Sequence, residues 1–134
     1  MDNDVFESIK SMSKEDAGVF LRHNGCNCCQ AVLIAYMKEL GMDAELLHRL
    51  GAGFGAGMGT GDGDCGALIG AVMVDDIIGS RRNSAASRKL RAGFCERCGA
   101  VRCSDLKGIT SGKMICSCDD CIRNAIREIE NNRT

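Results

Sequence analysis

The chain has 134 residues, of which 45% are hydrophobic, a composition suited to one globular core. The 17 basic and 18 acidic residues are mixed along the chain, which leaves no basic face for a nucleic acid. No stretch approaches the roughly 18 apolar residues that a membrane helix needs, and the first residues lack the pattern of a secretory signal. We therefore expect one domain over residues 1–134, in the cytoplasm, with no nucleic-acid or membrane partner.

Apolar spacing is helical through most of the chain and proline is absent, so the sequence predicts an all-α, compact helical bundle. After a short leading helix, capping residues and glycines mark where each further helix begins and ends. The expected helices run from Ser13 to Gly25, from Asn27 to Gly41, from Asp43 to the glycine-rich stretch, from Asp64 to Gly79, from Ser84 to Gly99, and from Ser117 or Asp119 to about Glu130. Residues 99–117 are predicted to be loop, with one helical turn after Cys103.

Glycine occupies every odd position from Gly51 to Gly63, directly before Cys65. The run contains neither GxGxxG nor GxxxxGK[ST], so a nucleotide is not an expected cofactor. Glycine lets the backbone approach something bulky, and it forms tight bends with free N–H groups. The run is therefore expected either to surround a cofactor or substrate, or to be a flexible surface loop. The residues expected at a cofactor are Gly53, Gly55, Gly57, Gly59 and Gly66.

Small residues line one face of the helix expected after Cys65, at Gly66, Ala67, Gly70 and Ala71. A face without bulky side chains lets another helix pack very near. The partner helix is expected either within the same chain or across a homodimer.

Ten cysteines in a reducing compartment favour metal ligation or redox chemistry over structural disulfides. Cys28, Cys65 and Cys118 each follow a capping residue, which predicts each of them in the first turn of a helix. Free backbone N–H groups and the helix dipole favour a thiolate there. Cys103, followed by Ser104 and Asp105, could belong to the same set.

The remaining cysteines form a candidate second ligand set. Two thiols spaced like Cys95 and Cys98 share a helix face and can chelate an ion or cluster, or form a disulfide. No CxxC pair is followed by histidine, so haem is not expected. The members of this set are Cys26, Cys29, Cys95, Cys98, Cys116 and Cys121.

Several motifs carry a resemblance to a known family. Residues 25–33 read G-x-N-C-x-Q-A-V-L, residues 53–59 read G-F-G-x-G-M-G, and residues 65–70 read C-G-A-x-x-G. A single cysteine follows in AVRCSDL, and residues 118–125 read C-x-x-x-I-R-x-A. Together they resemble the redox-active proteins named for their C-GCAxxG-C-C cysteine pattern. The resemblance implies a helical fold and a shared redox-active or metal-binding set, which would be Cys28, Cys65, Cys103 and Cys118.

The chain also departs from that pattern. At Cys26, Cys98 and Cys121 the relatives tend to carry aromatic or other bulky residues. The additional thiols make a larger or second sulfur-ligated centre an expectation for this chain.

The leading functional hypothesis is a redox or electron-transfer protein that ligates an iron–sulfur cluster through thiolates from separate segments, because such clusters need four soft ligands. The ligands would be Cys28, Cys65, Cys103 and Cys118. Its electron partner is unknown, and whether it is an oxidoreductase or only a carrier stays open.

Two alternatives remain. The first is metal-free thiol–disulfide chemistry, in which Cys28 or Cys65 attacks and a neighbour such as Cys29 or Cys26 resolves the mixed disulfide. The second is a non-enzymatic zinc module with tetrahedral sulfur ligation. Its ligands would be Cys95, Cys98, Cys116 and Cys121.

Overall fold

A computed structural model describes residues 3–79 and 82–133, and within these ranges the fold is all-α, as predicted. The elements are, in chain order, α1 (Asn3–Ile9), α2 (Lys14–Arg22), α3 (Cys28–Ala35), α4 (Met37–Leu40), α5 (Ala44–Gly51), the 3₁₀ helix η1 (Ala52–Phe54), α6 (Gly66–Ile78), α7 (Ser84–Cys98), α8 (Cys103–Lys107) and α9 (Cys118–Arg133). In the described ranges no helix has both the length and the apolar character needed to cross a membrane.

Most predicted helix starts are confirmed. The side chains of Ser13, Asn27 and Asp43 each accept a backbone N–H from the first turn of the helix that follows. Asn27 also forms a capping box, in which the Gln30 side chain accepts the Asn27 backbone N–H. Of the two caps considered for α9, it is Ser117 that accepts a backbone N–H of the first turn, at 3.1 Å.

One helix is divided where the prediction had it continuous. The helix expected between Asn27 and Gly41 is interrupted at Tyr36, whose φ of −104° and ψ of 16° separate α3 from α4. Helix α7 begins at Ser84, as predicted, and is capped by the side chain of Asn83.

The start of α6 also differs. Asp64 does not cap this helix, because its backbone forms an isolated antiparallel bridge with Arg102. Cys65 is itself the N-cap residue, with no side-chain cap hydrogen bond. The glycine-rich segment is therefore tied to the chain before α8.

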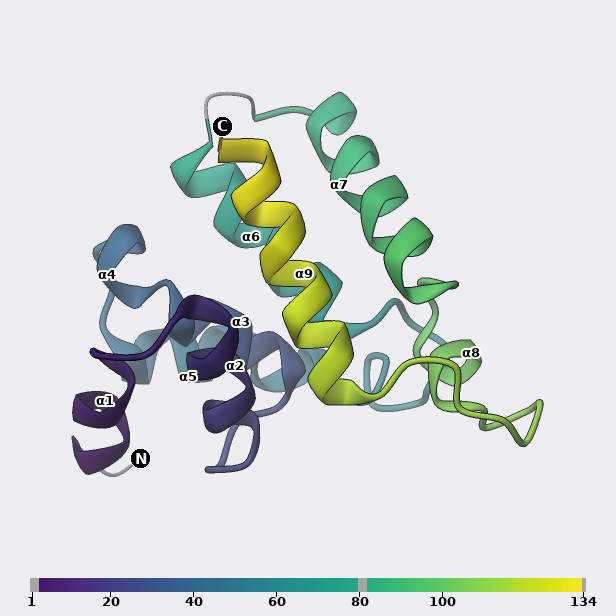
Figure 1. The fold of residues 1–134 in the computed structure, drawn as a ribbon, viewed down its shortest axis with the longest axis horizontal. Coiled ribbons are helices and arrows are strands. Elements are labelled where there is room, and N and C mark those ends of the chain that lie inside the picture. The colour runs from purple at the N-terminus through teal and green to yellow at the C-terminus, as the bar shows by residue number, and fades with distance from the viewer. Residues whose placement is uncertain (1–2, 80–81, 134) are drawn as a thin grey trace.

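Helix α9 lies at the centre of the fold and packs against α2, α3, α6 and α7 (Figure 1). The core is mainly aliphatic, as the scarcity of aromatic residues requires. Its largest fully buried side chains are Leu21, Leu33, Ile34, Tyr36, Leu47, Leu68, Leu90, Phe94, Leu106, Ile122, Ile126 and Ile129.

The small-residue face of α6 packs against α3 of the same chain. A Cβ placed on Gly70 would lie 3.0 Å from the backbone oxygen of Cys29 and 3.1 Å from Cβ of Val32. One placed on Gly66 would lie 2.7 Å from the backbone oxygen of Phe54. Close packing within the chain therefore accounts for these small residues without a second copy.

The glycine-rich segment contains a left-handed turn. Four consecutive residues have positive φ: Ala56 (52°), Gly57 (60°), Met58 (63°) and Gly59 (81°). The Gly59 N–H donates to the Gly55 carbonyl at 2.9 Å and closes the turn. Left-handed backbone costs a non-glycine residue about 1–2 kcal/mol, so surrounding contacts must hold Ala56 and Met58 in place. The segment thus has a defined conformation.

Candidate functional site

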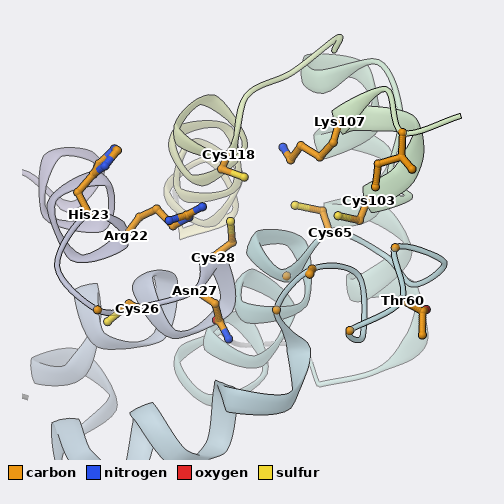
Figure 2. Close-up of a pocket in the computed structure, with 17 residues that line it drawn as sticks. Arg22, His23, Cys26, Asn27, Cys28, Thr60, Cys65, Cys103, Lys107 and Cys118 are labelled. Atoms are coloured by element: carbon orange, nitrogen blue, oxygen red, sulfur yellow. The ribbon is translucent and has the colours of Figure 1, made fainter. Parts of the chain in front are cut away.

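A pocket of about 980 Å³ opens where several helices begin. Five cysteines line it, and four of them stand where a helix begins: Cys28 is the first residue of α3, Cys65 is the N-cap residue of α6, Cys103 is the first residue of α8 and Cys118 is the first residue of α9. Figure 2 shows the sulfurs of Cys28 and Cys118 on one side of the pocket and those of Cys65 and Cys103 on the other. The structure thus brings together the four cysteines that the family resemblance singled out.

Backbone hydrogen bonds explain why Cys65 and Cys103 are neighbours. The Cys65 N–H donates to the Val101 carbonyl at 2.8 Å, and the Cys103 N–H donates to the Gly63 carbonyl at 3.0 Å. The bonds hold the end of the glycine-rich segment against the chain entering α8. Two thiols about 40 residues apart are therefore positioned by the backbone rather than by their own side chains.

Two cations face these sulfurs. Arg22, the last residue of α2, interacts with Cys28 and Cys118, and Lys107, the last residue of α8, interacts with Cys65 and Cys118 (Figure 2). No aspartate or glutamate is among the lining residues in the described part of the chain. The pocket is therefore suited to negatively charged sulfur and to an anionic guest.

The sulfurs of Cys28 and Cys118 are joined by one hydrogen bond, and its proton stays on Cys28. The Cys28 thiol donates a hydrogen bond to Cys118, which is the main reason that the pKa of Cys118 is lowered to about 5. Burial opposes this shift, while Lys107 and Arg22 reinforce it. The same hydrogen bond, followed by burial, raises the pKa of Cys28. At neutral pH the pair is a thiol beside a thiolate.

Cys65 and Cys103, on the other side of the pocket, are protonated. Cys65 donates a hydrogen bond to Cys121, and this bond, followed by burial, raises the pKa of Cys65. Burial raises the pKa of Cys103 as well. The expectation of a thiolate at every helix start is therefore wrong for Cys28, Cys65 and Cys103, because neighbouring sulfurs and burial outweigh the helix terminus.

The glycines expected at a cofactor divide into two groups. Gly55, Gly59 and Gly66 line the pocket, whereas Gly53 and Gly57 do not. Gly57 lies behind the wall, where a Cβ would come within 2.6 Å of Cβ of Cys103. Its role in the structure is to let the left-handed turn pack against that cysteine.

The six additional cysteines do not form one centre. Cys26 lines the pocket, although its sulfur lies apart from the other four (Figure 2). Cys29 is wholly buried under α6, and burial raises its pKa to about 12. Cys95 is exposed. The remaining three have sulfurs within 4.8 Å of one another: Cys98, Cys116 and Cys121.

The four-sulfur zinc set predicted from sequence is therefore wrong in one member. Cys95 lies on the exposed face of α7, and only Cys98 of that pair faces the buried side next to α9. Arg22 and Lys107 were not among the residues predicted from the sequence. Lys107 follows Cys103 by four residues, a spacing that places two side chains on one helix face and could have identified it.

Comparison with known protein families gives a match over most of the chain. A family model described as putative redox-active protein (C_GCAxxG_C_C) matches residues 26–132. The matched region contains every cysteine of the chain. Searches of curated proteins and of solved structures found no match.

Proposed function

The chain belongs to the C_GCAxxG_C_C family of redox-active proteins, and from this premise we propose that it is a cytoplasmic redox protein that carries electrons on an iron–sulfur cluster. The proposed ligands are Cys28, Cys65, Cys103 and Cys118. The observation that carries the proposal is that these four side chains, from helix starts far apart in sequence, line one pocket. When bound, such a cluster accepts and releases single electrons.

The arrangement of sulfurs fits a group larger than one ion. Across the described residues, the only group of three close cysteine, histidine or carboxylate ligands is the one outside the pocket, so no three pocket sulfurs are close enough for a single metal ion. A volume of about 980 Å³ leaves room for a multi-atom group between the sulfur pairs. Four thiolates separated in this way favour a cluster over mononuclear zinc.

Charge and backbone polarity support the same proposal. Four thiolates carry four negative charges, and Arg22 and Lys107 supply opposite charge at the pocket wall. The glycine-rich segment places Gly55, Gly59 and Gly61 in the pocket wall, where no side chain stands between the backbone and a guest. Backbone N–H groups that reach ligand sulfurs stabilise them and tune their reduction potential.

Anaerobic reconstitution of the full chain with ferrous iron and sulfide tests the proposal. We expect stoichiometric iron and acid-labile sulfide with visible thiolate-to-iron absorption. Serine substitution of Cys28, Cys65, Cys103 or Cys118 should remove most of the iron, whereas Cys95→Ser, at an exposed cysteine outside the pocket, should retain it. Iron-free, colourless protein, or equal iron in all five variants, would refute the cluster.

A second function is favoured by the contact between Cys28 and Cys118. The Cys118 thiolate could attack one sulfur of a substrate disulfide and displace the other as a thiolate. The Cys28 thiol would then lose its proton and attack the Cys118 sulfur, forming a Cys28–Cys118 disulfide and releasing the second substrate thiolate. Two electrons pass to the substrate, and an external dithiol must restore the reduced pair.

This second function differs in detail from the sequence-based alternative. The attacking sulfur would be Cys118, and its resolving partner would be Cys28 rather than Cys29 or Cys26. Mass spectrometry after mild oxidation of metal-free protein would detect the disulfide. Cys28→Ser should instead trap a mixed disulfide on Cys118, and a disulfide confined to other cysteines would rule this function out.

A further inference from the structure

Three cysteines outside the pocket form a buried group that adjoins it, because Cys121 accepts a hydrogen bond from the pocket thiol of Cys65. Cys98 is the last residue of α7, Cys116 lies in the loop before α9, and Cys121 lies in the first turn of α9. Their sulfurs all lie within 4.8 Å of one another, and the residues are only 5%, 7% and 0% exposed, respectively. The end of α7, the loop before α9 and the first turn of α9 therefore bring three sulfurs close together.

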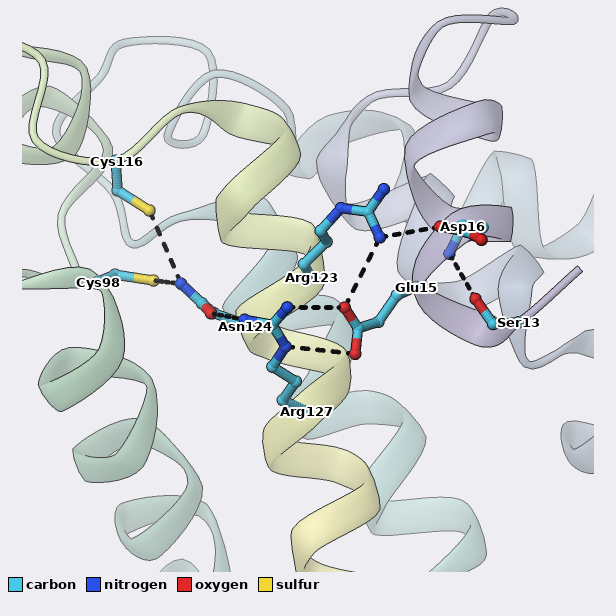
Figure 3. A network of polar contacts seen from close by, with 8 residues as sticks. All are labelled: Ser13, Glu15, Asp16, Cys98, Cys116, Arg123, Asn124 and Arg127. Atoms are coloured by element: carbon cyan, nitrogen blue, oxygen red, sulfur yellow. Dashed lines mark hydrogen bonds and ion pairs between the residues drawn. The ribbon is translucent and has the colours of Figure 1, made fainter.

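Polar donors point at each sulfur of this trio. The Lys107 ammonium lies 3.3 Å from Sγ of Cys121. The Asn124 side-chain nitrogen lies 3.3 Å from Sγ of Cys98 and 4.0 Å from Sγ of Cys116 (Figure 3). Cysteines that act only as small apolar residues do not need an ammonium and an amide directed at them. Donors of this kind stabilise sulfur that binds a cation.

The orientation of Asn124 is itself held in place. Its side-chain oxygen accepts a hydrogen bond from Arg127 at 3.1 Å, and Arg127 in turn pairs with Glu15 at 3.1 Å (Figure 3). Because the amide oxygen is occupied by Arg127, the amide nitrogen faces the sulfurs. A supporting network that orients the groups around the ligands is typical of metal sites.

We propose that Cys98, Cys116 and Cys121 bind one zinc ion as three thiolates, at a site distinct from the redox pocket, with a water molecule or other small ligand in the fourth position. Bonds of about 2.3 Å to one tetrahedral ion put sulfurs about 3.8 Å apart, so the observed arrangement needs only a small contraction. Binding would release the three thiol protons to solvent.

Charge favours a divalent ion over a monovalent one. Three thiolates with Zn²⁺ leave a net charge of −1, which the single Lys107 ammonium can offset. The same thiolates with Cu⁺ would leave −2 in a buried position. Burial of unbalanced charge is costly, so this site suits zinc better than monovalent copper.

Zinc titration of the full-length, metal-free, reduced protein against a chromogenic chelator tests the proposal. We expect one zinc ion per chain in the wild type and in the Cys28→Ser/Cys118→Ser variant, which lacks two pocket thiols. Cys98→Ser or Cys116→Ser should weaken binding by roughly 100-fold or more, and Asn124→Ala by roughly 10-fold. Cys95→Ser is the matched control on the same helix and should bind as the wild type does.

A second measurement uses only the wild-type protein, so its result does not depend on whether a variant folds. Zinc should protect Cys98, Cys116 and Cys121 of the wild-type protein from alkylation, as read by peptide mass spectrometry, while Cys95 stays reactive. The proposal is overturned if no zinc binds, if only Cu⁺ binds, if protection falls on the pocket cysteines instead, or if two of the trio are found as a disulfide in the freshly reduced protein. Iron and sulfide content is measured independently, so failure here does not imply failure of the proposed cluster.

Discussion

The side-chain nitrogen of Lys107 lies 3.3 Å from the sulfur of Cys121, while the same side chain lines the pocket that holds Cys65 and Cys118. One cation therefore serves both cysteine groups. Burial acts to lower the pKa of Lys107, but its interactions with the sulfurs of Cys121, Cys118 and Cys65 outweigh burial and raise the pKa. Lys107 consequently stays charged at neutral pH, where both groups need a counterion.

The alkylation of Cys118 in reduced, metal-free protein should depend on pH in an unusual way. Only the thiolate reacts, and the pKa of Cys118 is lowered to about 5. We expect its rate with iodoacetamide to rise through about pH 5 and to level off below neutrality, while Cys28, whose pKa is raised, stays slow. Peptide mass spectrometry over a pH series measures both rates. A Cys118 rate that still rises between pH 7 and 9 would contradict the assignment.

Removing either cation should weaken this effect. Lys107→Met and Arg22→Gln each take away a positive charge that lowers the pKa of Cys118, so the pKa should move up toward that of an ordinary thiol. The measurement is the same alkylation profile, whose midpoint should move to higher pH. Lys113→Met serves as the control because Lys113 is an exposed lysine in the following loop. An equal shift in this control would show that net charge, rather than proximity, sets the pKa.

Two substitutions in the left-handed turn should change the free energy of unfolding in opposite directions: glycine for alanine should raise it, and alanine for glycine should lower it. Ala56→Gly relieves left-handed strain of about 1–2 kcal/mol but adds unfolded-state entropy, for a net gain of about 0.5–1 kcal/mol. Gly57→Ala adds strain and a Cβ within 2.6 Å of Cys103 Cβ, so it should cost about 2–4 kcal/mol. Urea denaturation under reducing conditions measures both.

Gly59→Ala separates the two expected costs of Gly57→Ala, which are left-handed backbone strain and the contact of the new Cβ with Cys103. Gly59 has a φ of 81°, but a Cβ there would have no neighbour within 4 Å. Its substitution should therefore cost only the backbone strain, about 1–2 kcal/mol. A loss at Gly57 no larger than the loss at Gly59 would show that the contact with Cys103 is unimportant.

The contact between α3 and α6 should tolerate no added methyl group. Gly70→Ala places Cβ 3.0 Å from the Cys29 carbonyl oxygen, and we expect a loss of about 1–2 kcal/mol after the gain in helix propensity is subtracted. Gly53→Ala has no neighbour within 4 Å and no positive φ. It should change the free energy of unfolding by less than about 0.5 kcal/mol, and equal losses at both sites would argue against close helix packing.

The helix starts were largely predictable because capping is local chemistry. Ser13, Asn27 and Asp43 bond to N–H groups two or three residues away, so neighbouring residues suffice to identify them. Asp64 has the same chemistry but is engaged in a bridge with Arg102, a contact that spacing along the chain does not reveal. Tertiary contacts decided the start of α6.

The candidate site was predictable only in part for a similar reason. Family motifs identified the four pocket cysteines, but the choice between Cys95 and Cys98 depends on which face of α7 is covered by α9. Arg22 lies on α2 and reaches the pocket only because that helix packs beside α9. A side chain that reaches a site through tertiary packing has no pattern in the neighbouring sequence that would identify it.

Cys118 and Cys121 stand three residues apart in the first turn of α9, one in the pocket and the other in the buried trio. A helical turn moves as a unit, so a ligand or oxidation event that displaces one sulfur displaces the other. The two sites are then thermodynamically linked. If metal binding at the trio shifts the reduction potential of the pocket, oxidation or reduction of the pocket must change the metal affinity of the trio by the same free energy.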